Sequence, residues 1–400
     1  MTLKNNKILF IGGGFEQLEV IKNVKKYGKT IIVTNPEPND EIRKYTTHIE
    51  MLDPLDISKG EKIFKKYKPD AIITDACDYS NYLKNYLCTK YNLPCEGLKQ
   101  AALSCNKFLV REICREKLIL QPKYELCSSV NDLNIFLEKT QLPLIVKPID
   151  NRGSIGVNII RNKKELNQKF FHTLTHSASR QIIAEAYIEG KHVTVDGVFD
   201  NEGNFFNLAI AEKKVEIIDD HPVITEVNYP ASTIEISLRK ELEQINFQII
   251  ESLNFKKGLT HTEFIIDKRK RIFLVETTNR GGGVLTSTVI LKKLTAINIS
   301  DYLIKNALGL RQNLEIKKNS SFVRLKFLKF KSGKIKKIIH DTKVKNLLNF
   351  RINLKHGNTI SPAKSGDKRH GFVIFFEKNL KKLEQSQKKI LKKIKIIYGK

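Results

Sequence analysis

One hairpin-like segment, residues 258–283, constrains the fold of this chain more than any other stretch. Two runs rich in β-forming residues, GLTHTEFIID and IFLVETTN, flank the polar tetrapeptide KRKR, which is the usual signal of a β-hairpin. If Arg269 and Lys270 form the turn, Glu263 lies directly opposite Glu276, and directly opposed side chains in a sheet are about 5 Å apart. The sequence therefore predicts two carboxylates side by side on one face of a hairpin.

Both faces of the predicted hairpin are apolar. Ile265 and Leu274 would share the face of the glutamates, and the other face would hold Phe264, Ile266, Phe273 and Val275. Two carboxylates on an apolar face repel each other and are poorly solvated, whereas a divalent cation such as Mg²⁺ prefers carboxylate oxygens and would neutralise them. The alternative is a register slip by one residue, which would turn one glutamate to solvent.

Length and composition place this chain among globular proteins of several domains. Its 400 residues are too many for one ordinary domain and predict two or three, and 41% of them are hydrophobic. No run approaches the roughly 18 apolar residues of a membrane span, and the N-terminus lacks the apolar length and cleavage site of a signal peptide. The six cysteines lie between 77 and 127 and form no CxxC pair, so we expect reduced thiols, a cytoplasmic location and no membrane partner.

The net charge of +27 raises the question of nucleic-acid binding. Only 14 of the 70 basic residues are arginines, and the chain is also rich in isoleucine and asparagine, a pattern typical of an AT-rich coding sequence in which lysine fills solvated positions. No aromatic–basic stripe or recognised nucleic-acid motif is present. We therefore do not expect nucleic acid as a partner, although the cationic field should attract phosphorylated or acidic small molecules.

The N-terminal part alternates short β runs with helical ones over residues 7–98, which predicts a Rossmann-like parallel sheet. Its first turn, GGGFEQ, resembles a dinucleotide-binding fingerprint. However, Gln17 stands where that fingerprint has its third glycine, and the second strand ends at Asn35 rather than at an acid. We favour a small carboxylate or phosphate ligand at this turn, with NAD as the alternative.

The rest of the chain reads as mixed helices and strands. Helices are predicted over 106–118, 130–139 and 238–253, strands over 181–216, and an irregular stretch over 217–233 that contains His221 and Tyr229. Near the C-terminus, FVRLKFLKF and GKIKKIIH are predicted to form a hairpin around Ser332 and Gly333, followed by a further strand and a lysine-rich amphipathic helix. This last region predicts a small α+β domain.

Lys147 and the loop that follows it form a candidate phosphate site. The strands LPLIVKPI and VNIIR are joined by DNRGSIG, residues 150–156, which we call the glycine loop. Backbone N–H groups of such a loop can surround phosphate oxygens, and the lysine supplies a point charge. The alternative is an ordinary hairpin loop with Lys147 extended to solvent.

Together these pieces resemble the ATP-grasp superfamily, in the order NKFLVREICREKL, LPLIVKPIDNRGSIGV, IIAEAYIEGKHVTVDG, GLTHTEFIID and LVETTNRGGG. The resemblance covers nearly the whole chain and implies an α/β and α+β multidomain protein. We expect a Rossmann-like pre-ATP-grasp domain over 1–105, an ATP-grasp domain of two α+β subdomains that clamp ATP over 106–312, and a small α+β C-terminal domain over 313–400.

The resemblance also implies roles for individual residues. Lysines and the glycine loop would hold the phosphates of ATP, and the backbone of the hinge at 185–188 would hold adenine. The implied ATP-binding residues are Lys107, Lys147, Ser154, Gly156, Glu185, Tyr187, Ile188 and His192. Glu263 and Glu276 would coordinate Mg²⁺ or Mn²⁺, one of them bridging two ions.

Two positions depart from the pattern of the superfamily. Where a ribose-binding acid is usual, this chain has His192, which can bond a ribose hydroxyl or be an exposed strand residue. The third metal ligand is commonly the Asn of an E-x-N-P-R run; here Thr278 occupies that position and Asn279 follows one residue late, so either is a candidate. Arg280 matches the arginine and would stabilise an anionic intermediate, the alternative being a structural ion pair with a hairpin glutamate.

Within the superfamily, the GGGFEQ, HTEF and SGDKRHGFVIFF segments look most like ATP-dependent carboxylate–amine ligases, with L-amino-acid ligases as the nearest group. The resemblance implies an enzyme that activates a small-molecule carboxylate as an acyl phosphate and joins it to an amine, with a homodimer as a candidate assembly. The alternatives are an ATP-dependent carboxylase of the biotin-carboxylase or purine-pathway type and a nucleotide-binding regulator without catalysis.

Overall fold

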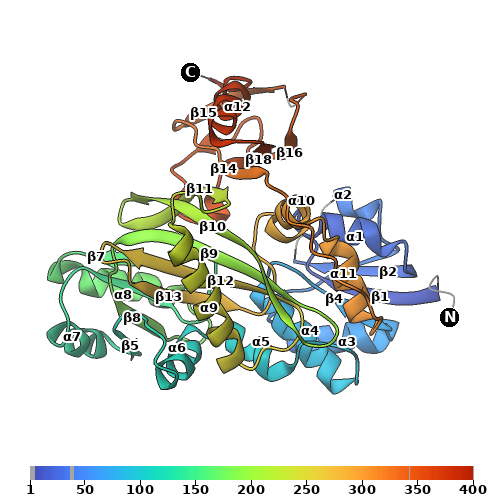
Figure 1. Ribbon diagram of the computed structural model, residues 1–400, viewed down its shortest axis with the longest axis horizontal. Helices are drawn as coiled ribbons and strands as arrows, with labels where there is room; N and C mark the ends of the chain where they lie inside the picture. The colour runs from blue at the N-terminus through green and yellow to red at the C-terminus, as the bar shows by residue number, and fades with distance from the viewer. Residues whose placement is uncertain (1–4, 37–39, 342, 400) are drawn as a thin grey trace.

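The computed structural model describes residues 5–36, 40–341 and 343–399 (Figure 1). Four sheets lie within these residues. In Figure 1 the N-terminal elements lie at the right, the elements around residues 120–190 at the left and the C-terminal elements at the top, with the strands that connect them in the middle. None of the helices in these ranges is long and apolar enough to cross a membrane. This mixed α/β and α+β architecture confirms the predicted fold class.

The N-terminal domain contains the predicted parallel sheet. Its order is β3-β2-β1-β4, with strands β1 (Asn6–Ile11), β2 (Gly28–Asn35), β3 (His48–Met51) and β4 (Ala71–Ile73). The helices of this region are α1 (Leu18–Val24), α2 (Asp40–Arg43), α3 (Ile57–Tyr67), α4 (Asp78–Lys90) and α5 (Leu98–Ser104). Both faces of the sheet are apolar and buried, as expected of a parallel sheet covered by helices.

A small antiparallel sheet follows in the chain. Its order is β5-β8-β6-β7, with strands β5 (Tyr124–Cys127), β6 (Leu144–Pro148), β7 (Asn158–Ile160) and β8 (Ile182–Ala186). Its apolar face packs on α7 (Val130–Glu138) and α8 (Leu166–Thr175), and a 3₁₀ turn at Lys163–Glu165 directly precedes α8. The glycine loop connects β6 to β7 at the edge of this sheet.

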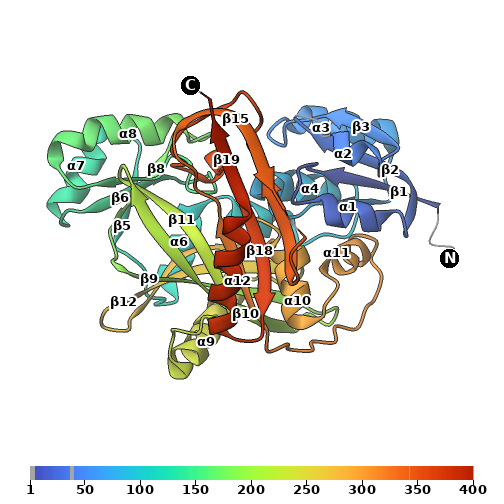
Figure 2. The ribbon, with the colours of Figure 1, turned by 90° about the horizontal axis from the view of Figure 1, so that it is seen from above.

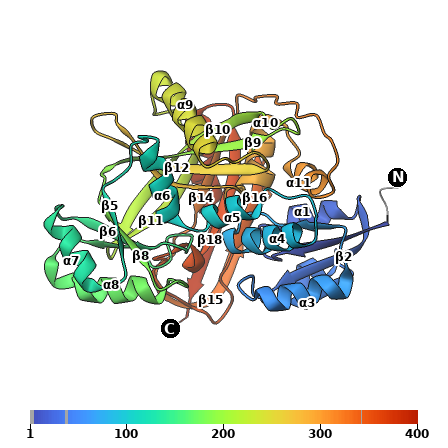
Figure 3. The ribbon, with the colours of Figure 1, turned by 90° about the horizontal axis from the view of Figure 1, so that it is seen from below.

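An eight-stranded sheet in the order β13-β12-β9-β10-β11-β14-β18-β16 forms the centre of the molecule. Its strands are β9 (Gly190–Phe199), β10 (Phe205–Ile218), β11 (His221–Tyr229), β12 (Leu259–Asp267), β13 (Ile272–Thr278), β14 (Phe322–Phe327), β16 (Leu347–Ile352) and β18 (Gly371–Glu377). One face is apolar and packs on α6 (Lys107–Glu116) and α9 (Ile236–Ser252). Seen from below, α4, α5, α6 and α9 follow one another along the molecule (Figure 3).

The segment predicted to be irregular, 217–233, is instead the tip and second strand of a long hairpin. β10 runs to Ile218 and β11 begins at His221, so Asp219 and Asp220 form a two-residue turn with φ of 49° and 62°. Positive φ at both positions is the type I′ geometry that two-residue hairpins prefer. The sequence prediction was wrong here because the turn contains two aspartates rather than Asn-Gly, and because Pro222 opens the second strand.

The predicted hairpin around Ser332 and Gly333 is also wrong. β14 extends the central sheet by pairing with β11 and β18, whereas β15 (Gly333–His340) belongs to a separate sheet of order β17-β15-β19. The remaining C-terminal elements are β17 (Thr359–Ile360), a 3₁₀ turn at Gly366–Lys368, α12 (Leu380–Lys392) and β19 (Ile394–Tyr398). Seen from above, α12, β15, β18 and β19 cross the middle of the molecule between the N-terminal domain and the small sheet (Figure 2).

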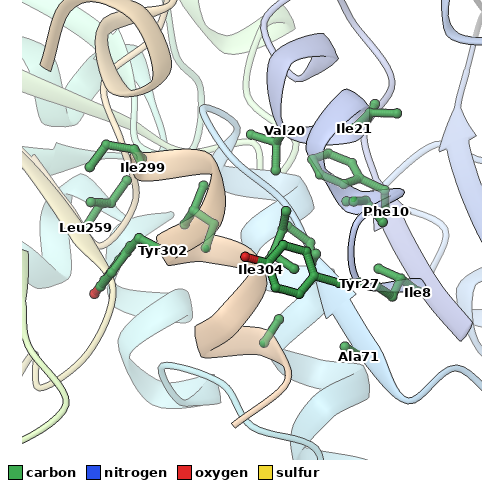
Figure 4. Close-up of a cluster of buried hydrophobic side chains, with 14 of the residues drawn as sticks. Ile8, Phe10, Val20, Ile21, Tyr27, Ala71, Leu259, Ile299, Tyr302 and Ile304 are labelled. Atoms are coloured by element: carbon green, nitrogen blue, oxygen red, sulfur yellow. The ribbon is translucent and has the colours of Figure 1, made fainter. Parts of the chain in front are cut away.

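The segment after β13 packs back onto the N-terminal domain. It contains a π-helical turn (Thr286–Leu291), α10 (Lys292–Thr295) and α11 (Ile299–Ala307). Ile299, Tyr302 and Ile304 of α11 share one apolar cluster with Ile8 and Phe10 of β1 (Figure 4). The apolar cores on either side of residues 105 and 312 are joined. The division of the chain into domains at these two residues therefore stays a proposal.

Candidate active site

The β12–β13 hairpin places Glu263 directly opposite Glu276, as predicted. The turn differs from the expected one, because Ile266 pairs with Ile272 and the N–H of Asp267 donates to the carbonyl of Arg271, which leaves three residues, 268–270, in the turn. Lys270, the last of the three, has a φ of 63°. A bulge between the two glutamates and the turn, at Val275, then inserts one residue into β13 and restores the pairing of the carboxylates.

Because the turn is longer than predicted, the side chains of β13 between the turn and the bulge lie on the opposite face from the predicted one. Leu274 is fully buried in the apolar cluster behind the sheet, whereas Val275 lines the central cavity and Phe273 pairs with Ile265, which also lines it. The assignment of Phe273, Leu274 and Val275 to faces was wrong because a one-residue shift in register inverts every side chain of a strand.

The polar face of the central sheet and the glycine loop enclose a cavity of about 130 Å³, which we call the central cavity. It is lined by nine of the residues singled out from the sequence, drawn from both sheets and from α6. They are Lys107, Lys147, Ser154, Glu185, Tyr187, Ile188, His192, Glu263 and Glu276. Gly156, Asn279 and Arg280 are not among its lining residues.

Each hairpin glutamate is bound by a lysine. Lys213 Nζ lies 2.6 Å from Glu263 Oε1, and Lys107 Nζ lies 3.0 Å from Glu276 Oε1. Burial by itself raises the pKa of Glu263, but the charge of Lys213 and a hydrogen bond from His261 outweigh it and hold that pKa well below its ordinary range. The expected repulsion between the two carboxylates is therefore relieved by lysines in this structure.

A second buried charge cluster lies at the hinge. Lys147 Nζ is 2.8 Å from Glu185 Oε2, and Arg111 donates to Glu185 Oε1 through Nε at 3.0 Å and Nη2 at 2.9 Å. Arg111 also donates to the carbonyls of Leu274 and Val275, so it joins α6, the hinge and the β13 bulge. Burial, with the charge of Arg111, lowers the pKa of Lys147.

The glycine loop is held in a strained shape beside these lysines. Gly153, Ser154 and Gly156 have φ of 62°, 59° and 75°. Lys107 Nζ donates to the carbonyl of Asn151 at 2.5 Å and so links this loop to Glu276. A Cβ at Gly156 would meet His176 Cβ at 2.6 Å and Pro148 Cγ at 2.9 Å, so Gly156 shapes the loop from behind.

The hinge leaves little of its own backbone free. The N–H groups of Ala186 and Tyr187 donate to the carbonyls of Lys123 and Pro143 at 2.9 and 3.1 Å. The next residue, Ile188, lines the central cavity. His192 also lines it and pairs across the sheet with Lys213; burial, followed by the charge of Lys213, lowers the pKa of His192 to about 4. His192 is therefore neutral at physiological pH.

Two buried oxygen atoms at the C-terminal end of β13 have no hydrogen-bond partner among the described residues: Thr278 Oγ1 and Asn279 Oδ1. Thr278 is two residues from Glu276 and so shares its face of β13. The amide nitrogen of Asn279 donates to the carbonyls of Lys257 and Leu259 at 2.9 and 3.0 Å, which turns this side chain toward the start of β12.

Arg280 is fixed by an acid that the sequence analysis did not consider. Its Nε and Nη2 donate to the two carboxylate oxygens of Asp78 at 2.9 and 2.8 Å, and Nη1 donates to the carbonyl of Gly281. Asp78 is the first residue of α4. The ion-pair alternative for Arg280 is thus present, with an N-terminal acid in place of a hairpin glutamate.

Two further acids lie near Arg280, and with Asp78 we call them the acidic cluster: Glu16, Asp75 and Asp78. Glu16 accepts the backbone N–H of Val284 at 2.6 Å, and Asp75 Oδ1 is buried without a hydrogen-bond partner among the described residues. Burial raises the pKa of Glu16 and raises that of Asp75 to about 6. Gln17 Oε1 accepts the N–H of Gly14 at 3.0 Å, so this side chain closes part of the GGGFEQ turn, and Glu16 of the acidic cluster lies in the same turn.

A buried hydrogen-bonded chain supports Glu263 from behind. Tyr229 Oη donates to Asp196 Oδ2 at 2.7 Å, Asp196 Oδ1 is 2.7 Å from His261 Nδ1, and His261 Nε2 is 3.5 Å from Glu263. The charge of Asp196 raises the pKa of His261 against the opposing effect of burial. A Cβ at Gly282 would lie 2.9 Å from His261 Nδ1, so glycine is needed there for close packing.

The donor set fits Mg²⁺ and a triphosphate. Glu263, Glu276 and the unbonded oxygens of Thr278 and Asn279 are the hard oxygen ligands that Mg²⁺ prefers. Within the described residues, no group of three or more His, Cys, Asp or Glu side chains could hold a metal. Three lysines at 107, 147 and 213 line the same cavity and match the charge of phosphates.

Comparison with known proteins agrees with this geometry. Residues 140–288 match the family described as the ATP-grasp domain. The carbamoyl phosphate synthase large chain of Clostridium botulinum is 22% identical over 329 residues, which cover 78% of this chain and 30% of that protein. This chain thus spans about 30% of the length of that relative.

Solved structures extend the similarity over the whole chain. The L-amino acid ligase of Bacillus licheniformis has a TM-score of 0.83 at 19% identity and covers 99% of both chains. The biotin carboxylase of Campylobacter jejuni has a TM-score of 0.76 at 17% identity, covering 98% of this chain and 92% of its own. At such identities the likeness shows the fold alone.

Proposed function

We propose that this chain, whose residues 140–288 match the ATP-grasp domain family, is an ATP- and Mg²⁺-dependent ligase that joins a carboxylate to an amine. The observation that carries the proposal is the central cavity, in which three lysines and the glycine loop face two paired glutamates. The cavity is smaller than the roughly 300–1,000 Å³ of typical ligand sites. Entry of ATP would therefore part the Lys107–Glu276 and Lys213–Glu263 pairs.

The residues of the cavity would take distinct roles toward ATP. Lys107, Lys147 and the amides around Ser154 would hold the phosphates, and the backbone of Ile188 would hold adenine because the preceding hinge amides are bonded elsewhere. Neutral His192 would bond a ribose hydroxyl. Glu263 and Glu276 would hold Mg²⁺, completed by Thr278 or Asn279, and when bound the ion would neutralise charge on the triphosphate.

The proposed reaction has two steps. An oxygen of the substrate carboxylate attacks the γ-phosphorus of ATP, and the bond from that phosphorus to ADP breaks, giving an acyl phosphate. The amine then attacks the acyl carbon, the bond to phosphate breaks, and the amine proton is lost with release of inorganic phosphate. The charges of Asp78 and Glu276 both raise the pKa of Arg280, so the guanidinium interacts electrostatically with Glu276. Arg280 would stabilise the anionic acyl phosphate.

The acidic cluster supports an amino-acid substrate. Asp75 carries a buried oxygen without a partner, and burial raises the pKa of both Asp75 and Glu16, so a cationic group nearby would be bound favourably. An ammonium group supplies that charge and also three hydrogen-bond donors. An α-amino acid carries such a group next to the carboxylate that is to be activated.

The test is a screen for phosphate release. Purified protein with ATP and Mg²⁺ should release inorganic phosphate when pooled amino acids are added, and mass spectrometry should find the joined product. Glu276→Gln should be inactive, whereas the exposed Glu189→Gln should match the unmodified protein. Release triggered only by bicarbonate would favour the carboxylase alternative, and nucleotide binding without release under any condition would favour the regulator.

A further inference from the structure

A second cavity, of about 600 Å³, lies apart from the lysine–glutamate pairs. It is bounded by the end of the β10–β11 hairpin on one side and by β14, the loop at 361–370 and the α12–β19 junction on the other. Much of its wall is aliphatic or aromatic: Ile218, Val223, Leu328, Phe330, Leu391 and Ile394. Its size falls within the roughly 300–1,000 Å³ range of small-molecule sites.

The charges around this second cavity are mostly positive. Lys326, Lys329, Lys331 and Arg369 line it, against the single carboxylate of Glu216 among its lining residues. Lys329 Nζ lies 3.4 Å from Glu216 Oε2, which is a long distance for an ion pair. Arg369 lies 3.7 Å from the centre of the Phe327 ring, so its guanidinium is held at the cavity wall. Cations at the edge of an apolar wall are complementary to a molecule with an apolar body and an anionic end.

We propose that the second cavity binds a small organic anion with an apolar body, such as an aliphatic or aromatic carboxylate, sulfonate or phosphate. The apolar body packs on the aliphatic wall, and the anionic end meets Lys329, Lys331 and Arg369. This proposal does not depend on the proposed ligase reaction, because it concerns binding at a different set of residues.

The second cavity is connected physically to the central one through β11. Ile224 lines both cavities, and its neighbour Val223 lines the second one. An anion bound in the second cavity therefore presses on the strand that also covers the central cavity. Any coupling between the two sites is reciprocal, so an occupant that changed the affinity for Mg-ATP would have its own affinity changed by the same factor.

The test uses decanoate as the probe, with 8-anilinonaphthalene-1-sulfonate as a fluorescent reporter and the full chain as the protein. Decanoate should displace the reporter from one saturable site, whereas decanol, which lacks the charge, should not. Lys331→Glu should weaken decanoate binding by roughly fivefold, about the effect of one charged contact at a partly exposed position. Lys337→Ala, on the exposed part of β15, should leave binding unchanged.

A second variant tests the apolar wall. Leu391→Trp should reduce the capacity for decanoate by filling the second cavity, and its unfolding midpoint confirms that the variant is folded. If it does not fold, Lys331→Glu and its Lys337→Ala control decide the question alone. Equal displacement by decanol or equal binding by Lys331→Glu would overturn the proposal, because each places the probe elsewhere.

Discussion

The charged form of Lys147 is disfavoured by burial and would be stabilised by a bound phosphate. It is paired with Glu185, which Arg111 also binds, so one carboxylate faces two cations. The pKa of Lys147 is lowered by burial and by the charge of Arg111. A triphosphate would bring the missing negative charge into this cluster. The excess positive charge of this cluster therefore favours the binding of an anionic ligand.

Replacing this lysine tests that preference. Lys147→Ala should weaken ATP binding by about 1–3 kcal/mol, the range for a hydrogen bond to a charged group, as measured by calorimetry in the presence of Mg²⁺. Glu185 keeps its two bonds from Arg111, so the variant should stay folded. Lys139→Ala, exposed at the end of α7, is the control and should bind ATP normally. Unchanged affinity in Lys147→Ala would exclude its phosphate role.

Asp75 gives a prediction about stability. Its folded-state pKa of about 6 lies above its ordinary 3.8, so the folded protein is stabilised below pH 3.8 and loses that stability as the pH rises through 6. At about 1.4 kcal/mol per pKa unit, the buried charge costs roughly 3 kcal/mol at neutral pH. Asp75→Asn should therefore be more stable than the unmodified protein at pH 8, by about 2–3 kcal/mol.

The measurement is urea unfolding at two pH values. The difference between Asp75→Asn and the unmodified protein should be large at pH 8 and close to zero at pH 4. The exposed Asp53→Asn should show no such dependence. If Asp75 holds the ammonium group of a substrate, the more stable variant should also lose amino-acid-dependent phosphate release. A gain in stability equal at both pH values would show that the charge of Asp75 is not its cause.

Residue types and their order along the chain predicted nine of the residues that line the central cavity. They did not predict the partners of those residues. Lys213, Arg111 and Asp78 lie on β10, α6 and α4, and each binds a site residue from another element. A lysine in a run such as AEKKVE has no feature that marks it as buried. Only the register of β10 against β9, which pairs Lys213 with His192, brings it into the cavity.

At the scale of elements, the β12–β13 hairpin shows how a correct prediction can follow from a wrong assumption. A two-residue turn was assumed, and the observed loop of three residues shifts the register by one. The bulge at Val275 shifts it back, so the glutamates pair as expected while three side chains between them and the turn change face. Bulges leave no sequence signal of their own at a residue such as valine, which explains why only the pairing was predictable.

The turn itself supplies a prediction. Lys270 has a φ of 63°, a left-handed conformation that costs an L-residue about 1–2 kcal/mol and costs glycine little. Lys270→Gly should therefore be at least about 1 kcal/mol more stable than Lys268→Gly, which gains nothing from glycine. The two variants are matched, because each loses one exposed lysine–glutamate pair. Equal unfolding free energies for the two would mean that the turn is not strained at Lys270.

At the scale of the whole molecule, three of the C-terminal strands, β14, β16 and β18, are part of the central sheet. β14 pairs with β11 through Glu226 to Tyr229, and Val323, Leu325 and Phe327 share one apolar cluster with Val227 and Tyr229. Gly366 donates its N–H to the carbonyl of Gly153 in the glycine loop at 2.9 Å. The C-terminal sequence predicted a small domain over 313–400, and strand pairing joins this region to β11 of the central sheet. Such long-range pairing is not visible in local patterns.

This continuity predicts the outcome of truncation. A chain ending at residue 312 would expose the edge of β11 and the apolar side chains that β14 and β18 cover, and an uncovered apolar strand edge favours aggregation. The truncated protein should be insoluble or lack a cooperative thermal transition. The full chain should unfold cooperatively and be stabilised by Mg-ATP, by an amount that rises with the logarithm of its concentration above the Kd. A soluble 1–312 fragment with an unchanged transition and an unchanged shift on adding Mg-ATP would instead show that the boundary at 312 separates independent domains. The two outcomes differ in solubility, in cooperativity and in nucleotide-induced stabilisation, so a thermal unfolding series on both chains distinguishes them.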